Sequence, residues 1–222
     1  LLERIKVEDY DGARKFLDVP EAEGFSAITI PLLSSWMDLA QHKLTKPVLM
    51  DDVAKAAGNF APFVYYHLAL INDQAGFTDV AERYYTRAVK DAVKVPYRVT
   101  EVFANFYQRN GKPDKTKALI EQYKKSNPQT YLLEDSLSFA NAQVPDSAPI
   151  ISTVQKGVAE IYFAIASVLY SEDLLPDSLA YLNMARYLRP DFPAAQLMLG
   201  SVQEQMGNHQ AAQETYRSID AE

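Results

Sequence analysis

The side chains that could carry out chemistry are few and far apart in this chain of 222 residues. Its three histidines, His42, His67 and His209, include no pair at the i, i+4 spacing that places two metal ligands on one face of a helix. There is no cysteine, which excludes disulfides and thiolate-bound metal. We therefore predict no metal site and no cofactor.

Adjacent carboxylates occur at Asp51-Asp52, Glu134-Asp135 and Glu172-Asp173. Paired carboxylates can perform the acid–base chemistry of glycoside hydrolysis. Each pair lies at an expected turn or helix start, where the helix dipole favours acidic side chains, and we prefer that structural interpretation. No serine lies in a G-x-S-x-G turn, and the eight glycines form no phosphate-binding loop. We predict no catalytic residues and no enzymatic activity.

Composition narrows the classes of partner. The formal net charge of −7 argues against a nucleic-acid surface, which needs clustered basic residues. Hydrophobic residues make up 48% of the chain, which is enough for a packed core. No apolar run approaches the roughly 20 residues of a membrane-spanning helix, so we expect no membrane insertion. The chain begins and ends inside expected helices, which indicates a fragment of a longer protein.

The elements that position these side chains follow a repeat between Ala159 and Asp220. Small residues at Ala166 and Gly200 lie 34 positions apart, as do the larger Leu182 and Tyr216. Apolar residues at three- and four-residue spacing predict two helices in each copy. The small residues permit the two helices of a pair to approach closely, and the large ones fill the space toward the next pair. Such units must stack to bury both of their faces.

This pattern resembles the tetratricopeptide repeat (TPR) family, and the stretches 157–166 and 181–192 are similar to bacterial members. The resemblance implies an all-α fold, a right-handed α-solenoid of stacked antiparallel helix hairpins, without a cofactor. It leaves the bacterial cytoplasm and the periplasm both open as compartments. We predict one solenoid over 1–222, divided into a truncated repeat at 1–24, a degenerate hairpin at 25–61, repeats at 62–96 and 97–130, an irregular insertion at 131–158, and repeats at 159–192 and 193–222.

The resemblance also implies a concave groove that is lined by the first helix of each unit and binds a peptide or a protein surface. Aromatic and polar side chains share the corresponding positions, and such combinations suit peptide capture. The alternative is that the aromatic residues pack in the core, as aromatic residues at helical spacing usually do. The positions are Phe63, Tyr66, Leu70, Asp73, Arg98, Glu101, Asn105, Gln108, Phe163, Ser167 and Tyr170.

One TPR subclass binds C-terminal carboxylates with a clamp of Lys, Asn and Arg. Only Asn105 fits that clamp here, so we expect no carboxylate clamp. Our main hypothesis is a protein–protein interaction scaffold that binds another protein or a peptide. Two alternatives stay open: a helical regulatory or substrate-recruiting arm of a larger enzyme whose catalytic domain lies elsewhere, and self-association through exposed solenoid ends.

Overall fold

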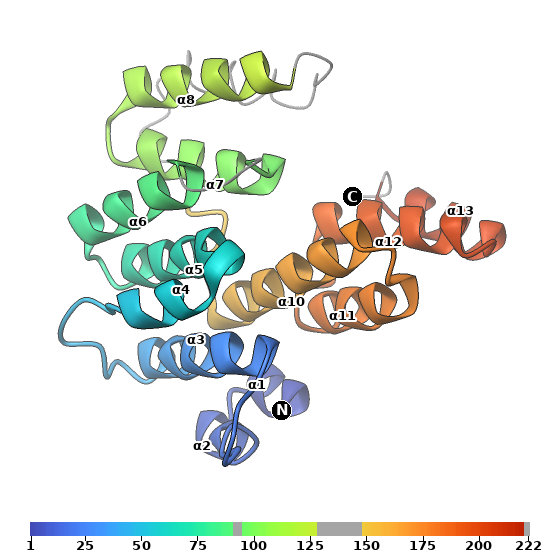
Figure 1. The fold of residues 1–222 in the computed structure, drawn as a ribbon, viewed down its shortest axis with the longest axis horizontal. Coiled ribbons are helices and arrows are strands. Elements are labelled where there is room, and N and C mark those ends of the chain that lie inside the picture. The colour runs from blue at the N-terminus through green and yellow to red at the C-terminus, as the bar shows by residue number, and fades with distance from the viewer. Residues whose placement is uncertain (91–94, 128–147, 220–222) are drawn as a thin grey trace. The chain divides into compact units, whose positions relative to one another are not determined.

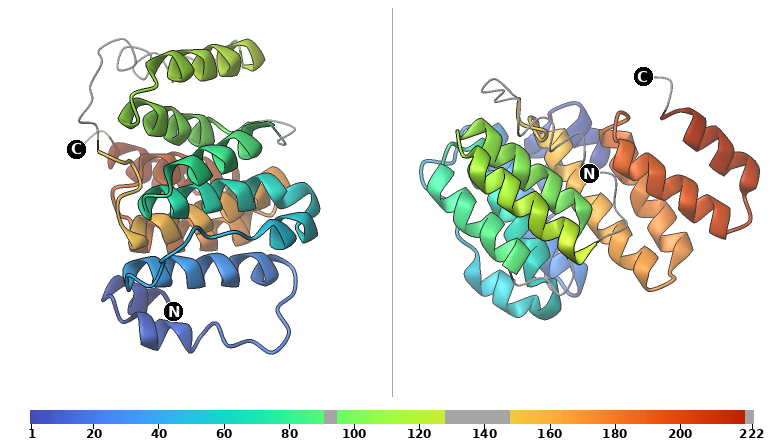
Figure 2. Two further views of the ribbon diagram at one scale, coloured as in Figure 1. Left: turned by 90° about the vertical axis from the view of Figure 1, so that its left-hand side faces the viewer. Right: turned by 90° about the horizontal axis from the view of Figure 1, so that it is seen from above.

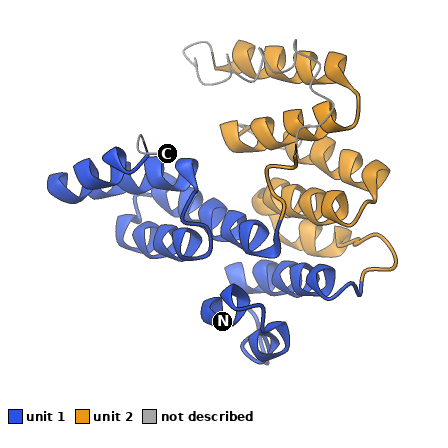
Figure 3. Ribbon diagram, turned by 180° about the vertical axis from the view of Figure 1, so that it is seen from behind, with its two compact units in different colours: residues 1–43, 153–222 blue, residues 44–152 orange. Residues whose placement is uncertain are grey.

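The computed structural model describes residues 1–90, 95–127 and 148–219, and every regular element among them is a helix (Figure 1). The helices form two compact units (Figure 3). Unit 1 comprises residues 1–43 and 153–222, and unit 2 comprises residues 44–152. Successive helices pair and stack within each unit, so the predicted all-helical fold of stacked hairpins is confirmed.

Unit 2 is built on two helix pairs, α5 with α6 and α7 with α8 (Figure 2). The turns of these pairs contain Gly76 and Gly111, whose φ angles of 82° and 66° are strained for residues that carry a side chain. The helices are α4 (Asp51–Ala56), the short 3-10 helix η1 (Gly58–Phe60), α5 (Ala61–Gln74), α6 (Thr78–Lys90), α7 (Tyr97–Arg109) and α8 (Pro113–Ser126).

Small residues lie where the helices of each pair cross. Ala69 of α5 and Ala81 of α6 are both fully buried. In the next pair Thr116 replaces the second alanine, and its hydroxyl donates to the carbonyl oxygen of Ala104 across the pair at 3.4 Å. The hydroxyl therefore remains hydrogen-bonded although Thr116 is fully buried, which explains why the repeat tolerates it.

Unit 1 contains two further pairs, α10 with α11 and α12 with α13, and α11 packs against α12 to join them. Ser178 of α11 repeats the arrangement of Thr116, since its hydroxyl donates to the carbonyl oxygen of Ala166 at 2.9 Å. The helices are α1 (Leu2–Lys6), α2 (Tyr10–Arg14), α3 (Phe25–Ala40), α10 (Val154–Ser171), α11 (Leu175–Leu188), α12 (Pro193–Gln205) and α13 (His209–Arg217).

Two glycines inside helices permit a close approach of aromatic rings. A Cβ atom on Gly200 would lie 2.2 Å from Cε1 of Tyr216, so this ring packs against Gly200 within its own helix pair, whereas the sequence analysis assigned it to the space toward the next pair. A Cβ atom on Gly157 would lie 2.3 Å from Cζ2 of Trp36 in α3. Trp36 is fully buried, so Gly157 provides space for α3 to pack against α10.

The degenerate hairpin expected at 25–61 is divided between the units. Its first helix, α3, packs against α10, and its second, α4, packs against α5. Pro31 lies in the interior of α3, so it is not the first turn of that helix. Helix α10 begins at Val154, because the Thr153 side chain caps it by accepting a hydrogen bond from the Lys156 N–H. Of the predicted insertion at 131–158, residues 131–147 lie outside the described part.

Candidate functional site

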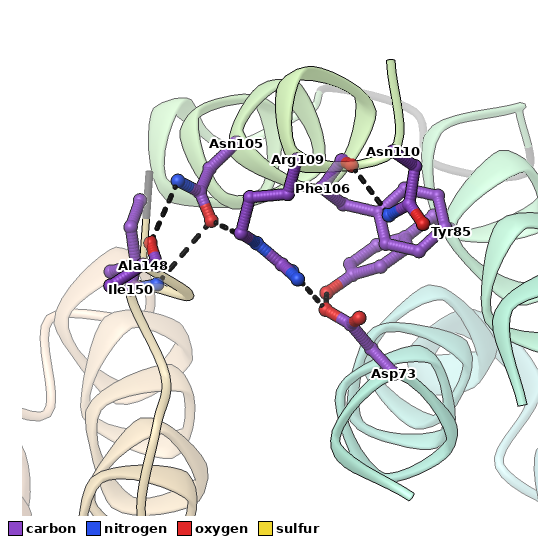
Figure 4. Close-up of polar contacts among 8 residues, drawn as sticks. All are labelled: Asp73, Tyr85, Asn105, Phe106, Arg109, Asn110, Ala148 and Ile150. Atoms are coloured by element: carbon purple, nitrogen blue, oxygen red, sulfur yellow. Dashed lines mark hydrogen bonds and ion pairs between the residues drawn. The ribbon is translucent and has the colours of Figure 1, made fainter. Parts of the chain in front are cut away.

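A polar network in unit 2 joins α5, α7 and the segment Ala148–Ile150 (Figure 4). Asp73 lies in the last turn of α5, and Arg109 is the last residue of α7. The guanidinium of Arg109 donates from Nη2 to Oδ2 of Asp73 at 2.5 Å and from Nε to Oδ1 of Asn105 at 3.0 Å. Arg109 therefore connects two residues that the sequence predicted as separate contributors to a binding surface.

The Asp73–Arg109 pair is poorly exposed, with side-chain accessibilities of 8% and 17%. Burial raises the pKa of Asp73 above its usual value, although the charge of Arg109 and hydrogen bonds from Arg109 and Tyr85 act in the opposite direction. The Tyr85 hydroxyl reaches Oδ2 of Asp73 at 3.5 Å. A buried carboxylate without a partner strongly destabilises a fold, so Arg109 is required to stabilise the folded protein when Asp73 is charged.

Asn105 uses both ends of its side-chain amide on the backbone of its own chain (Figure 4). Its Nδ2 donates to the carbonyl oxygen of Ala148 at 3.2 Å, and its Oδ1 accepts from the N–H of Ile150 at 3.3 Å. An amide held in this way recognises a backbone and is independent of the side chains that the bound segment carries. Glu101, Asn105 and Gln108 follow one another at i, i+4 and i+7, and we call these three residues the inner stripe of α7.

The remaining predicted residues of unit 2 are largely used inside the unit. Nη1 of Arg98 donates to Oε2 of Glu101 at 2.7 Å, and Arg98 is itself buried. Tyr66 and Leu70 are buried, and Phe63 makes an edge contact with His67 at 4.6 Å between ring centroids. In this unit Tyr66, Leu70 and Arg98 thus have little surface, whereas Phe63 and the three residues of the inner stripe are partly exposed.

In unit 1 the three predicted residues lie along α10. Phe163 is buried against Phe192, with ring centroids 5.0 Å apart. Ser167 donates to the carbonyl oxygen of Phe163 at 2.8 Å and contacts the sulfur of Met198 at 3.6 Å. The Tyr170 hydroxyl accepts a hydrogen bond from Nε2 of Gln205. Of these three, Ser167 and Tyr170 keep partial exposure.

Leu197 of α12 is a candidate that the sequence analysis missed. It lies 34 residues after Phe163, at the same offset in the next repeat, and half of its surface is exposed. The repeat period could have identified it, because adding 34 residues to the position of Phe163 gives Leu197. An exposed leucine at this offset adds apolar surface beside the partly exposed polar residues of α10.

Chemistry other than binding has little support within the described residues. No three histidine, aspartate or glutamate side chains there form a group that could hold a metal ion. Asp51, from one of the adjacent carboxylate pairs, accepts hydrogen bonds from Tyr84 and Arg87, which is a structural use. None of the helices that the structure describes is long and apolar enough to cross a membrane.

The last helix pair matches a known repeat family. Residues 193–219, which span α12 and α13, match the model of a tetratricopeptide repeat. This match and the stacked helix pairs of the two units confirm the resemblance to the tetratricopeptide repeat that the sequence showed. No curated protein matches the chain.

Solved structures provide only distant likenesses. MamA from AMB-1 is 16% identical with a TM-score of 0.30, over 84% of this chain and 94% of that one. A monomeric mutant of IFIT1 with Gppp-AAAA is 18% identical with a TM-score of 0.34, over 99% of this chain and 46% of that one. Because both TM-scores are below 0.5, neither likeness informs the function of this chain.

Proposed function

We propose that this protein is a protein–protein interaction scaffold that binds an extended segment of a partner along the first helices of its repeats. In unit 2 the inner stripe of α7 and Asp73 would form the polar part of the surface. In unit 1 Ser167 and Tyr170 of α10 and Leu197 of α12 would form a surface of their own. The buried Tyr66, Leu70, Arg98 and Phe163 would support these positions from beneath, and Phe63 would border them.

The observation that carries this proposal is the double hydrogen bond of Asn105 to the backbone of Ala148 and Ile150. The pairing supports the proposal, because in it a residue of the inner stripe holds a segment of backbone by its peptide groups. Glu101 and Gln108 lie one turn to either side and are partly exposed. A partner segment bound next to Ala148–Ile150 would find a carboxylate and an amide there for its own N–H and C=O groups.

Site-specific photo-crosslinking tests the proposal. A benzophenone amino acid replaces Gln108 or Ser167 in the full chain, and the matched control carries it at Asp79, which is exposed at the start of α6. We expect one discrete adduct, identified by mass spectrometry, from the two inner positions and not from the control. Glu101→Lys should lower the yield of the Gln108 adduct. Equal labelling from Asp79 and Gln108 would refute the placement of the partner.

A further inference from the structure

A groove in unit 2 lies apart from the inner stripe. It has a volume of about 840 Å³ and is formed by α6, α7 and α8. Its α7 residues are Thr100, Phe103 and Tyr107, which form a different stripe of that helix from Glu101, Asn105 and Gln108. The volume falls within the range of about 300–1,000 Å³ that is typical of ligand-binding pockets. We call it the α6–α8 groove.

The surface of the α6–α8 groove is amphipathic. Val89, Phe103 and Leu119 supply an apolar floor from all three helices. Helix α8 presents one continuous face to the groove, since its lining residues recur at three- and four-residue spacing from Lys115 to Asn127. Ala118 lies in that face and is exposed, so this small side chain of α8 borders the groove from the solvent side.

The charged side chains that line the α6–α8 groove are basic. Lys90 and Lys115 line it, and no aspartate or glutamate is found among its described lining residues. Lys115 already pairs with Glu82 at 2.5 Å, and Lys112 pairs with the same carboxylate, so a carboxylate is the group that this part of α8 accepts. The surrounding sequence is basic in a chain of net charge −7, with Lys112, Lys117, Lys124 and Lys125 against Asp114 and Glu121.

We infer that the α6–α8 groove is a second protein-binding site that takes an acidic amphipathic helix of a partner. The apolar face of that helix would contact Phe103 and Leu119, and its carboxylates would pair with Lys90 and, in exchange with Glu82, with Lys115. This is helix-in-groove recognition, in which side chains at i, i+3, i+4 and i+7 anchor the ligand. The inference rests on the proposed function, because it assumes that the protein binds other proteins, but it uses a different surface.

The probe for this site is a fluorescein-labelled synthetic helix of about 16 residues, with leucine at the anchor spacing and glutamate elsewhere. Two matched peptides carry lysine in place of glutamate or the same residues in scrambled order. We expect fluorescence anisotropy with the full chain to give binding of the glutamate peptide about tenfold tighter than of either control. Binding should weaken as salt concentration rises, because Lys90 and Lys115 are exposed to solvent.

Three variants locate the binding. Ala118→Trp fills the groove from an exposed helical position and should abolish binding of the glutamate peptide, with an unchanged circular dichroism spectrum as the check on folding. Lys90→Glu should weaken binding about tenfold. Lys117→Glu makes the same charge change on α8 at an exposed position outside the lining, and should change binding less than threefold as a rough bound.

Four results would overturn the inference. They are no binding of the glutamate peptide, equal binding of its scrambled form, a concentration-dependent dimer that Ala118→Trp abolishes, and displacement of the probe by a peptide copying residues 129–143 of this chain. The third result assigns the groove to a second copy, and the fourth to the chain itself. If the groove inference fails while the Gln108 adduct still forms in Ala118→Trp, the scaffold proposal stands without it.

Discussion

His67 should make the free energy of unfolding depend on pH. The imidazole is fully buried in α5, and neither ring nitrogen has a hydrogen-bond partner among the described residues. The ring centroids of Phe63 and Tyr66 lie 4.6 Å and 5.2 Å from that of His67. Burial alone lowers the pKa of His67 from 6.5 to about 3, with no contribution from a charged neighbour. The ring therefore stays neutral in the folded protein at physiological pH.

The sign follows from proton uptake in the two states. Below about pH 6.5 the unfolded chain binds a proton at His67, whereas the folded chain binds one only near pH 3, so acid favours unfolding. From about pH 7.5 to pH 5 the expected loss is about 2 kcal/mol, and between the two pKa values the slope is about 1.4 kcal/mol per pH unit. Typical stabilities are about 5–15 kcal/mol, so a loss of this size is readily measured.

The assay is urea unfolding followed by circular dichroism at about pH 7.5 and pH 5, on the wild type and on His67→Leu. We expect the wild type to lose about 2 kcal/mol more than His67→Leu over this interval. His42→Gln and His209→Gln are the matched controls, because both residues are exposed. Each control should lose as much as the wild type, because His67 is unchanged in both.

A second measurement does not depend on any variant folding. Histidine side-chain resonances of the wild-type protein, followed by NMR from about pH 8 to pH 4, should show that the His67 ring stays neutral over this range. A His67 ring that gains a proton near pH 6.5 would contradict the burial argument directly. So would equal pH dependence of stability in the wild type and His67→Leu.

Three further perturbations test other parts of the structure. Gly157→Ala should lower the melting temperature measured by calorimetry, because its Cβ would meet the Trp36 ring at 2.3 Å, and overpacking typically costs about 1–3 kcal/mol; Gly207→Ala, where a Cβ meets no atom within 4 Å but φ is 79°, reports backbone strain alone. Arg109→Met should cost about 3–5 kcal/mol in urea unfolding at neutral pH by leaving the Asp73 carboxylate buried and unpaired, and adding Asp73→Asn should restore part of the loss. Leu199→Ala should cost about 2–5 kcal/mol as a large-to-small change in the core, whereas Glu204→Ala should be near neutral, and equal melting temperatures for these two variants would count against the assigned helix faces.

The helix pairs could be predicted from sequence because a local pattern determines them. A small residue at Ala166 and a hydroxyl or methyl side chain at Ser178, 12 residues later, must meet if two helices joined by a short turn are to pack. The same spacing places Thr116 opposite Ala104 and lets its hydroxyl find a carbonyl oxygen. These contacts lie within about one repeat, so a period of 34 residues contains the information needed to place them.

Contacts between distant segments could not be read from that period. Trp36 and Gly157 are 121 positions apart by their residue numbers, and nothing in either local sequence links them. The division of residues 25–61 between two units agrees with this packing, since α3 packs against α10 and Trp36 lies against Gly157 of that helix. The poor match of this stretch to the repeat pattern showed that it was unusual. Only the structure shows that α10 is the helix against which α3 packs.

In the candidate site, residue type limits what the sequence can predict about binding partners. Asn105 was selected by its offset on the inner face, and in the structure its amide binds the backbone of Ala148 and Ile150. The position was therefore predictable, but the identity of the bound segment was not, because a peptide group of this chain and one of a partner are equivalent acceptors and donors. Asp73 shows the same ambiguity, since a carboxylate placed for a partner is neutralised here by Arg109.

Burial shows which of the predicted site residues still have surface for a partner, and therefore which of them should contribute binding energy. Tyr66, Leu70 and Phe163 have little surface left, so their truncation should affect stability before it affects affinity. Leu197 is half exposed at the offset that Phe163 occupies one repeat earlier, which makes it an apolar residue of α12 that a partner could contact. A few well-packed residues usually carry most of the binding energy of an interface, so truncating Leu197 tests whether it is one of them. If the scaffold proposal is right, Leu197→Ser should weaken the partner adduct at Ser167 without lowering the melting temperature.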